Sequence, residues 1–215
     1  MLETVQDTRQ RLLEVAEQFY AERGFEGTSL RSLTDAAGVN LAAVNYHFGS
    51  KRNLMWEMFS ARIEPINTQR MFLLDKVLAG PELPTLEGVF DALLVPVFDV
   101  AQGPNGANLI FLRMIGRVFS ESEEFWHQLH NQFFDVLCRR FLDAIVLAEP
   151  KLSPEEVAWR FHFSIATMLG ALGTHKSLNR NCASVPTLNG NDMDETCLRL
   201  RNFICAGFRG AQLKP

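Results

Sequence analysis

The sequence predicts an all-α protein, and three observations support this fold class. Apolar residues recur at three- and four-residue spacing over most of the chain. Serine, threonine or asparagine stands before several of these segments, and glycine or proline follows them, as at helix ends. No segment shows a convincing strand pattern. The 215 residues suffice for one large or two small domains, and a content of 47% hydrophobic and 21% charged residues is ordinary for globular proteins.

The first predicted element is an amphipathic helix over residues 7–23, which ends at Gly24. Thr28 or Ser29 can cap a second, short helix that extends to about Ala37. This first helix is expected to support the short helices that follow.

Gly38 offers the left-handed conformation that stops the second helix, and Asn40 can cap a third over residues 41–47. Helix, glycine turn and helix form the helix-turn-helix arrangement, whose second helix enters the major groove of DNA. The residues spaced to face inward are Leu30, Leu33, Ala37, Val44 and Phe48.

Arginine and lysine residues lie at the N-termini of two predicted helices, where the helix macrodipole disfavours positive charge. Arg31 lies in the first turn of the second helix, and Lys51 with Arg52 follows Ser50, which caps the fourth. Because a helix N-terminus carries partial positive charge, these cations call for an outside anion, and phosphate is the natural candidate. The alternative is that they are solvated surface charges.

The segments AAGVN (36–40) and YHFGSK (46–51) resemble the signature of the TetR family of bacterial transcriptional regulators. The resemblance covers roughly residues 8–60 and includes the preceding helix. NLAAVNYHFGSK (40–51) resembles the subgroup that senses long-chain fatty acids or their CoA esters. One departure is Asn45-Tyr46, where many members carry an aromatic pair.

The resemblance implies a three-helix DNA-binding domain (1–55) and a larger helical domain for ligand binding and dimerisation (56–215). Asn can pair with adenine edges, and small or apolar side chains can approach a thymine methyl. For Thr28 capping alone is an alternative role, and for His47 a helix-end position favoured by the dipole. The predicted DNA-binding residues are Thr28, Arg31, Asn40, Leu41, Ala42, Ala43, Asn45, Tyr46, His47 and Lys51.

The net charge of −4 is not that of a non-specific nucleic-acid binder. No run of 18 uncharged apolar residues and no apolar signal region is present, so we expect no membrane association and a cytoplasmic location. The four cysteines are interpreted as reduced thiols, with a redox switch left open.

No catalytic motif is found, and neither a cofactor nor a metal is expected. His127 and His130, one turn apart beside Glu123 and Glu124, are a weak metal signal only.

The rest of the chain is predicted to be helical. Ser50 starts a long helix that Pro65 should bend or interrupt. Further helices are expected over 86–101, over 108–121 (apolar nearly all round, hence buried), from Ser122 to before Pro150, from Pro154 onward, and from Asp192 or Asp194 to about Phe208. Residues 103–106 and 179–191 are expected to be loops.

Small residues on the last two long helices permit close helix approach: Ala166, Gly170, Ala171 and Gly173, then Ala206 and Gly207. The resemblance implies a four-helix bundle made from these helices of two protomers. Such a homodimer would read a pseudo-palindromic operator in double-stranded DNA. The alternative is core packing within one chain.

The predicted larger domain (56–215) is rich in aromatic residues, which favours a cavity for a small apolar or amphipathic effector. The alternative is that these residues only fill the hydrophobic core. A buried arginine needs an anionic partner, either a nearby carboxylate or a ligand carboxylate or phosphate. The predicted ligand-binding residues are Arg113, Arg117, Phe111, Phe134 and Arg160. A fatty acid or acyl-CoA that releases a repressor from DNA is the leading hypothesis; a DNA-bound adaptor for a partner protein is the alternative.

Overall fold

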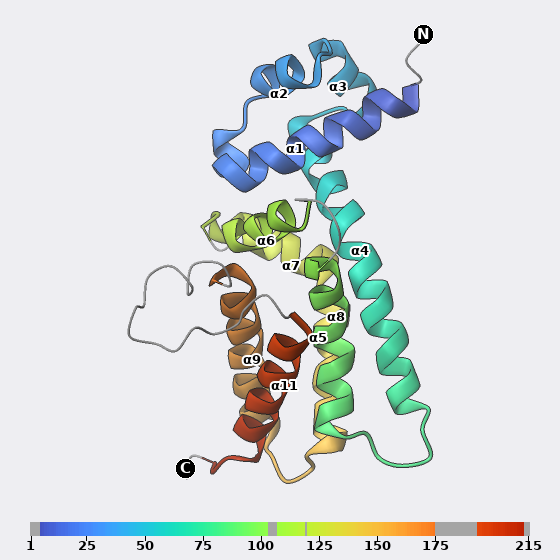
Figure 1. Ribbon diagram of the computed structural model, residues 1–215, viewed down its shortest axis with the longest axis vertical. Coiled ribbons are helices and arrows are strands. Elements are labelled where there is room, and N and C mark those ends of the chain that lie inside the picture. The colour runs from blue at the N-terminus through green and yellow to red at the C-terminus, as the bar shows by residue number, and fades with distance from the viewer. Residues whose placement is uncertain (1–4, 103–106, 119, 175–192, 213–215) are drawn as a thin grey trace. The chain divides into compact units, whose positions relative to one another are not determined.

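The computed structural model describes residues 5–102, 107–118, 120–174 and 193–212 (Figure 1). Within these ranges every regular element is a helix, so the all-α prediction is confirmed. None of the described helices combines the length and apolarity needed to cross a membrane. The predicted loops at 103–106 and 179–191 lie outside the described residues.

The chain packs as two compact units. The head unit comprises Met1–Pro65 with Asn105–Leu129, and the body unit comprises Ile66–Pro104 with His130–Pro215. The sequence predicts a continuous first domain that ends at residue 55. The head unit is instead discontinuous, because residues 105–129 pack with residues 1–65.

The head unit is built on α1 (Val5–Gly27), α2 (Leu30–Ala37), α3 (Leu41–Phe48) and the first part of α4 (Lys51–Leu78). It also contains α6 (Ala107–Val118) and the start of α7 (Glu123–Phe133). Apolar side chains from these helices are almost completely buried between them, among them Leu12, Ala16, Tyr20, Leu33, Val44, Leu54, Phe59 and Met114.

Phe125 of α7 lies at the centre of an aromatic cluster in the head. Its ring centroid is 5.0 Å from that of Trp56, 5.4 Å from Phe25, 6.0 Å from Phe59 and 6.2 Å from Tyr20. Aromatic pairs at such separations are favourable beyond the area that they bury. Rings from α1, α4 and α7 therefore form one core, although α7 is distant in sequence.

Gly24 breaks the regular geometry of α1, as predicted, but the helix resumes and runs to Gly27. Its backbone (φ 73°, ψ −174°) is a conformation that only glycine adopts readily. The break frees the Phe25 N–H, which donates to Glu121 Oε1 at 2.8 Å. Glu121, in the turn after α6, thus ties that turn to α1, with which α6 packs extensively in Figure 1.

Pro65 does not interrupt α4, which is one helix from Lys51 to Leu78. A proline removes one hydrogen bond from the helix interior, and the carbonyl that loses it, that of Ala61, belongs to an exposed residue. Water can satisfy such a carbonyl, so the helix tolerates the residue. The division between the two units falls directly after Pro65.

The body unit contains the end of α4, α5 (Leu86–Gln102), α8 (Asp135–Ala148), α9 (Pro154–Thr174) and α11 (Met193–Arg209). Polar pairs join α5 to α11, which run antiparallel. Arg201 Nη1 donates to both oxygens of Asp91 at 2.9 and 3.1 Å, and Arg209 Nη2 donates to Glu87 Oε2 at 2.9 Å. These pairs fix the register of the two helices.

Two predictions about the middle of the chain are wrong. The single helix expected from Ser122 to Pro150 is broken at Phe134 (φ −122°, ψ −20°) into α7 and α8. The helix expected to be buried nearly all round, α6, buries Phe111, Met114 and Val118 but exposes Arg113. Apolar composition did not reveal that α6 packs through one face only.

Candidate nucleic-acid interface

Two caps and one glycine position α2 and α3. Ser29 Oγ accepts from the Ser32 N–H at 3.1 Å, and Asn40 Oδ1 accepts from the Ala43 N–H at 3.0 Å. Between them Gly38 adopts the left-handed conformation (φ 66°, ψ 33°). The predicted helix, glycine turn and helix are confirmed, with Ser29 as the first cap.

Leu33, Ala37, Val44 and Phe48 point into the head core, as predicted, and Leu30 is half-buried. The end of α3 is also tied to the start of α4, because Asn53 Nδ2 donates to the Phe48 carbonyl at 2.9 Å. One side of α3 is therefore fixed by burial, and its other side is left to the solvent.

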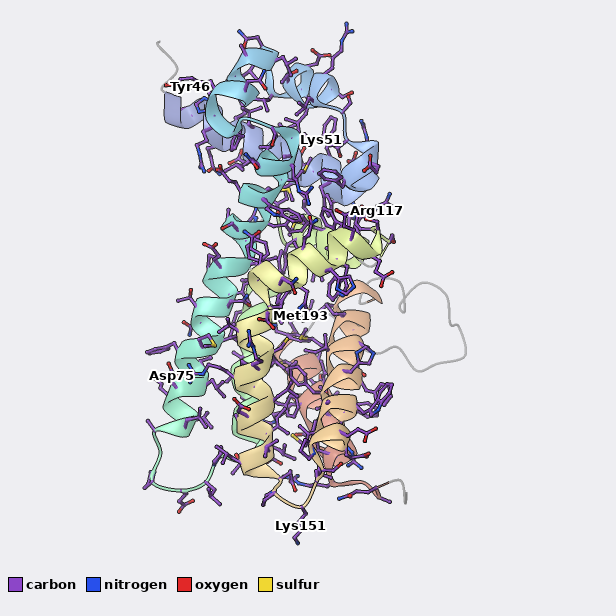
Figure 2. The ribbon with its side chains drawn as sticks, turned by 180° about the vertical axis from the view of Figure 1, so that it is seen from behind. Tyr46, Lys51, Asp75, Arg117, Lys151 and Met193 are labelled. Atoms are coloured by element: carbon purple, nitrogen blue, oxygen red, sulfur yellow. The ribbon has the colours of Figure 1, made fainter. Side chains whose placement is uncertain are left out.

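The solvent side of α3 carries the predicted reading residues. Leu41, Ala42, Asn45 and Tyr46 are exposed, with 77% of the Tyr46 surface accessible. Figure 2 labels Tyr46 on α3 and Lys51 at the start of α4. His47 is half-buried, with its ring centroid 5.0 Å from that of Tyr46. A helix with one such side free can enter a DNA groove without unfolding.

Cations flank this helix. Arg31 and Arg52 are exposed, and Lys51 Nζ lies 4.4 Å from the centroid of the Phe25 ring. Among the described residues none of the three forms an ion pair, whereas Arg9 of the same unit pairs with Glu57. Charges left without a carboxylate at helix N-termini remain available for phosphate oxygens.

Thr28 does not fit its predicted role. Its residue surface is 1% exposed, its hydroxyl donates to the Gly24 carbonyl at 2.8 Å, and its N–H donates to the Phe25 carbonyl. Both polar hydrogens are thus used inside the head, where they stabilise the turn between α1 and α2. Thr28 therefore stabilises this turn from within the head, and neither of its polar hydrogens is free for a phosphate.

The five predicted ligand-binding residues are divided between the two units. Phe111, Arg113 and Arg117 belong to the head unit, and Phe134 and Arg160 belong to the body unit. Arg113 is exposed, and Arg117, labelled in Figure 2, is half-buried beside Gly24. Their role in ligand binding stays a prediction.

Arg160 has a structural role that the sequence did not indicate. Its Nη1 donates to the carbonyls of Gly207, Phe208 and Gly210, and its Nη2 to that of Ala211 at 3.0 Å. Its Nε donates to Glu156 Oε1 at 2.8 Å. The guanidinium thus satisfies the free carbonyls at the end of α11, as a cation at a helix C-terminus does.

Sequence reasoning missed the buried Arg70 and the contacts of the half-buried Glu121 with α1. Burial, and next the charge of Glu121, raises the pKa of the Tyr20 phenol far above its ordinary value, so Tyr20 stays neutral. Arg70 of α4 is 5% exposed. The available signal was helical spacing, because Arg70 lies on the same face of the helix as Ile63, Ile66 and Leu74.

The cysteines within the described residues, Cys138, Cys197 and Cys205, are free thiols. Burial raises the pKa of Cys197 and of Cys205 to about 11, so both are protonated and weakly nucleophilic at neutral pH. In the described ranges no three potential metal ligands cluster, and on α7 the His127 Nε2 atom lies 3.4 Å from Glu123 Oε1.

Two family profiles match the chain. The profile of bacterial regulatory proteins of the tetR family matches residues 12–58, and that of the Tetracyclin repressor-like C-terminal domain matches residues 91–207. The second match alone covers more than half of the chain.

Curated relatives match over the head and its surroundings. The repressor AcnR of Corynebacterium glutamicum is 44% identical over 48 residues, 22% of this chain and 26% of AcnR. The repressor KstR2 of Mycobacterium tuberculosis is 32% identical over 88 residues, 41% of this chain and 43% of KstR2. The matches thus span from about a quarter to under half of these relatives.

Solved structures match over nearly the whole fold. The fatty acid degradation regulator FadR of Bacillus halodurans has a TM-score of 0.66 at 12% identity, over 95% of this chain and 97% of FadR. NalD of Pseudomonas aeruginosa has a TM-score of 0.64 at 20% identity, over 95% of this chain and 98% of NalD. With both family profiles matched and this fold shared, the chain belongs to the TetR family of bacterial regulatory proteins.

Proposed function

We propose that this protein is a sequence-specific, DNA-binding transcriptional regulator that acts as a dimeric repressor and is released by a small apolar effector. The observation that carries the proposal is the exposed side of α3, with Tyr46 at its centre and unpaired cations at the neighbouring helix starts. As a member of a family of regulatory proteins, the chain is not an enzyme.

An exposed apolar face of the body supports the dimer. Trp159 and Phe163 of α9 are exposed and stack at 5.7 Å between ring centroids, and Leu198 and Phe203 of α11 are exposed too. α9 and α11 lie side by side (Figure 1), and an added Cβ at Gly207 would meet no atom within 4 Å. Large apolar side chains next to small residues suit packing against the same helices of a second copy.

Dimerisation also gives the head its specificity. A single helix-turn-helix reads a short half-site, and two heads related by a two-fold axis read a pseudo-palindrome. The dimer has one conformation that can bind the operator and another that cannot. The effector releases the repressor if it binds the second conformation more tightly than the first, because only this difference in affinity shifts the equilibrium. A fatty acid or acyl-CoA is the proposed effector class, in keeping with the name of FadR.

The test is fluorescence anisotropy of the full chain on DNA from directly upstream of its own gene. We expect salt-sensitive, sequence-specific binding that Tyr46→Ala and Lys51→Ala each weaken by about tenfold or more. Lys51→Ala should also lower the slope of log affinity against log salt by about one, because one phosphate contact is lost.

Lys76→Ala is the matched control, because Lys76 Nζ lies 4.2 Å from the centroid of the Phe72 ring, as Lys51 does over Phe25. It should change neither the affinity nor the salt slope. If Tyr46→Ala and Lys51→Ala bind a selected operator as tightly as the unmodified protein does, the assignment of α3 as the reading helix is wrong.

Adding a long-chain acyl-CoA or a fatty acid separates the regulator from the adaptor. Release from DNA supports effector control. Specific binding that no lipid of a panel alters, without any thermal shift, supports the DNA-bound adaptor for a partner protein.

A further inference from the structure

Arg70 is a buried cation in the body unit. It lies on α4, close to the side chains and backbone of α5, α8 and α9, and only 5% of its surface is exposed. Its Nε donates to the Leu93 carbonyl at 2.8 Å, Nη1 to Asn67 Oδ1 at 3.3 Å and Nη2 to Met168 Sδ at 3.8 Å. All these acceptors are neutral, and among the described residues Arg70 forms no ion pair.

The two terminal nitrogens of Arg70 are poorly used. A guanidinium carries five N–H groups, and three of them have an acceptor within the described part of the chain. Nε donates to a carbonyl at a favourable distance. The hydrogen bond from Nη1 to Asn67 Oδ1 is long, and the acceptor of Nη2 is a sulfur atom, which is a weak acceptor. These two nitrogens form the edge with which arginine binds a carboxylate through two parallel hydrogen bonds.

Two neighbours of Arg70, Asn67 and Met168, contact the Nη1 and Nη2 atoms. Asn67 Nδ2 donates to the Phe133 carbonyl at 2.7 Å, which orients Oδ1 toward the guanidinium. The break at Phe134 ends α7 just there and leaves the Phe133 carbonyl free for Asn67. Met168 is a flexible side chain with a polarisable sulfur, so an incoming group can displace it at little cost.

Burying an unpaired ion costs several kcal/mol, and an anion that joins it recovers much of this energy. Burial lowers the pKa of Arg70 to about 10. At neutral pH the guanidinium therefore remains protonated. The body unit thus contains a cation that has no counterion among the described residues, and its polar contacts include the buried residues Leu93 and Met168.

We propose that Arg70 is the anchor for an effector with one carboxylate and an apolar chain, the carboxylate binding Nη1 and Nη2. One guanidinium neutralises one negative charge, so a phosphate dianion or a CoA headgroup is disfavoured relative to a single carboxylate. The inference rests on the proposed effector control and narrows the effector to a free carboxylic acid of the fatty-acid kind.

The experiment compares three ligands with the same chain, dodecanoate, dodecanol and dodecanoyl-CoA, by thermal shift and titration calorimetry on the full protein without DNA. We expect dodecanoate to bind at least tenfold more tightly than dodecanol, because a hydrogen bond to a charged group supplies the difference. Arg70→Met should abolish this preference, and Arg70→Lys should reduce it, since Lys keeps the charge but not the fork.

Arg140→Met is the matched control, because Arg140 pairs with Asp75 at the surface, at 2.6 Å. It should leave the preference for dodecanoate unchanged. Equal binding of dodecanoate and dodecanol by the unmodified protein overturns the proposal without needing any variant. A preference that persists in a folded Arg70→Met, or that is undiminished in a folded Arg70→Lys, overturns it as well. Preferential binding of dodecanoyl-CoA overturns it too.

DNA binding is measured separately, so the two proposals fail separately. Without ligand, Arg70→Met should bind the operator as the unmodified protein does. If the unmodified protein binds no DNA yet prefers dodecanoate through Arg70, the regulatory function fails and the carboxylate site stands. If operator binding is intact and no carboxylate preference exists, the reverse holds.

Discussion

The head and the body distribute their charged and apolar side chains in opposite ways. In the head, the apolar side chains of α2 and α3 are buried, and Arg31, Lys51 and Arg52 stay without carboxylate partners in the described ranges. In the body, Arg140, Arg201 and Arg209 pair with carboxylates, and the large apolar side chains of Trp159, Phe163 and Phe203 are exposed.

Each exposed set indicates a different partner. Unpaired cations around an exposed helix suit a polyanion, whereas exposed rings beside glycines suit another apolar surface. Arg70 is the exception within the body, since it is neither exposed nor paired. Under the two proposals, Arg31 and Arg70, which lack a carboxylate among the described residues, bind a ligand, whereas Arg201 and Arg209 join helices through carboxylates.

The largest expected effect comes from charging the apolar face of the body. Phe163→Glu, at a side chain that is 57% exposed, should convert the dimer to monomers without unfolding them. Because two linked heads bind with an avidity that one head lacks, affinity for a full operator should fall by about 100-fold. Light scattering after size exclusion gives the mass, and anisotropy gives the affinity.

Phe72→Glu serves as its control, because Phe72 of α4 is 51% exposed and lies outside α9 and α11. It should remain dimeric. A Phe163→Glu protein that stays dimeric at micromolar concentration would show that the exposed rings of α9 do not form the interface.

The next effect tests whether the head includes the turn after α6. Gly24→Ala forces φ of +73° on alanine and places its Cβ 2.6 Å from Glu121 Oε1 and 3.0 Å from Arg117 Nε. We expect a loss of about 3 kcal/mol in the free energy of unfolding. Gly38→Ala also has positive φ but meets no atom within 4 Å, and should cost about 1 kcal/mol. Equal losses in urea melts would mean that the contact with Glu121 contributes nothing.

The smallest effect concerns the Arg160 cap. Arg160→Ala leaves the carbonyls at the end of α11 without their donor, and about 1–2 kcal/mol of stability should be lost. Arg160→Lys should recover only part of this, because a lysine cannot reach all the carbonyls at once. Hydrogen exchange should show the loss at the end of α11, and unchanged exchange there would argue against the cap.

Local signals allowed the head to be predicted in detail. Ser29, Gly38 and Asn40 act through their own backbone and near neighbours, so their roles in ending and starting helices could be read from the sequence. The reading residues stay predictions, but the structure places Asn45 and Tyr46 on the open side of α3, as helical spacing requires.

The body was predicted only in outline, because its decisive contacts are long-range. The break at Phe134 has no proline or glycine to announce it, and Arg160 acts on carbonyls some fifty residues away. Arg113 and Arg117 were selected since their helix looked buried, yet only one face of α6 is. The acceptors of Arg70, the Leu93 carbonyl on α5 and the Met168 sulfur on α9, could be identified only from the fold.

The aromatic cluster around Phe125 determines which residues must be transferred together when the DNA-binding head is moved to another regulator. A chimera that transplanted only residues 1–55 would leave behind the Phe125 ring and the Glu121 carboxylate, and would expose Tyr20 and Phe25. The transferable module is discontinuous: it requires residues 105–129 as well, although the family's C-terminal profile begins at residue 91. Recombination at the obvious linker would therefore cut through a folding unit, and viable hybrids should carry both segments from the same parent.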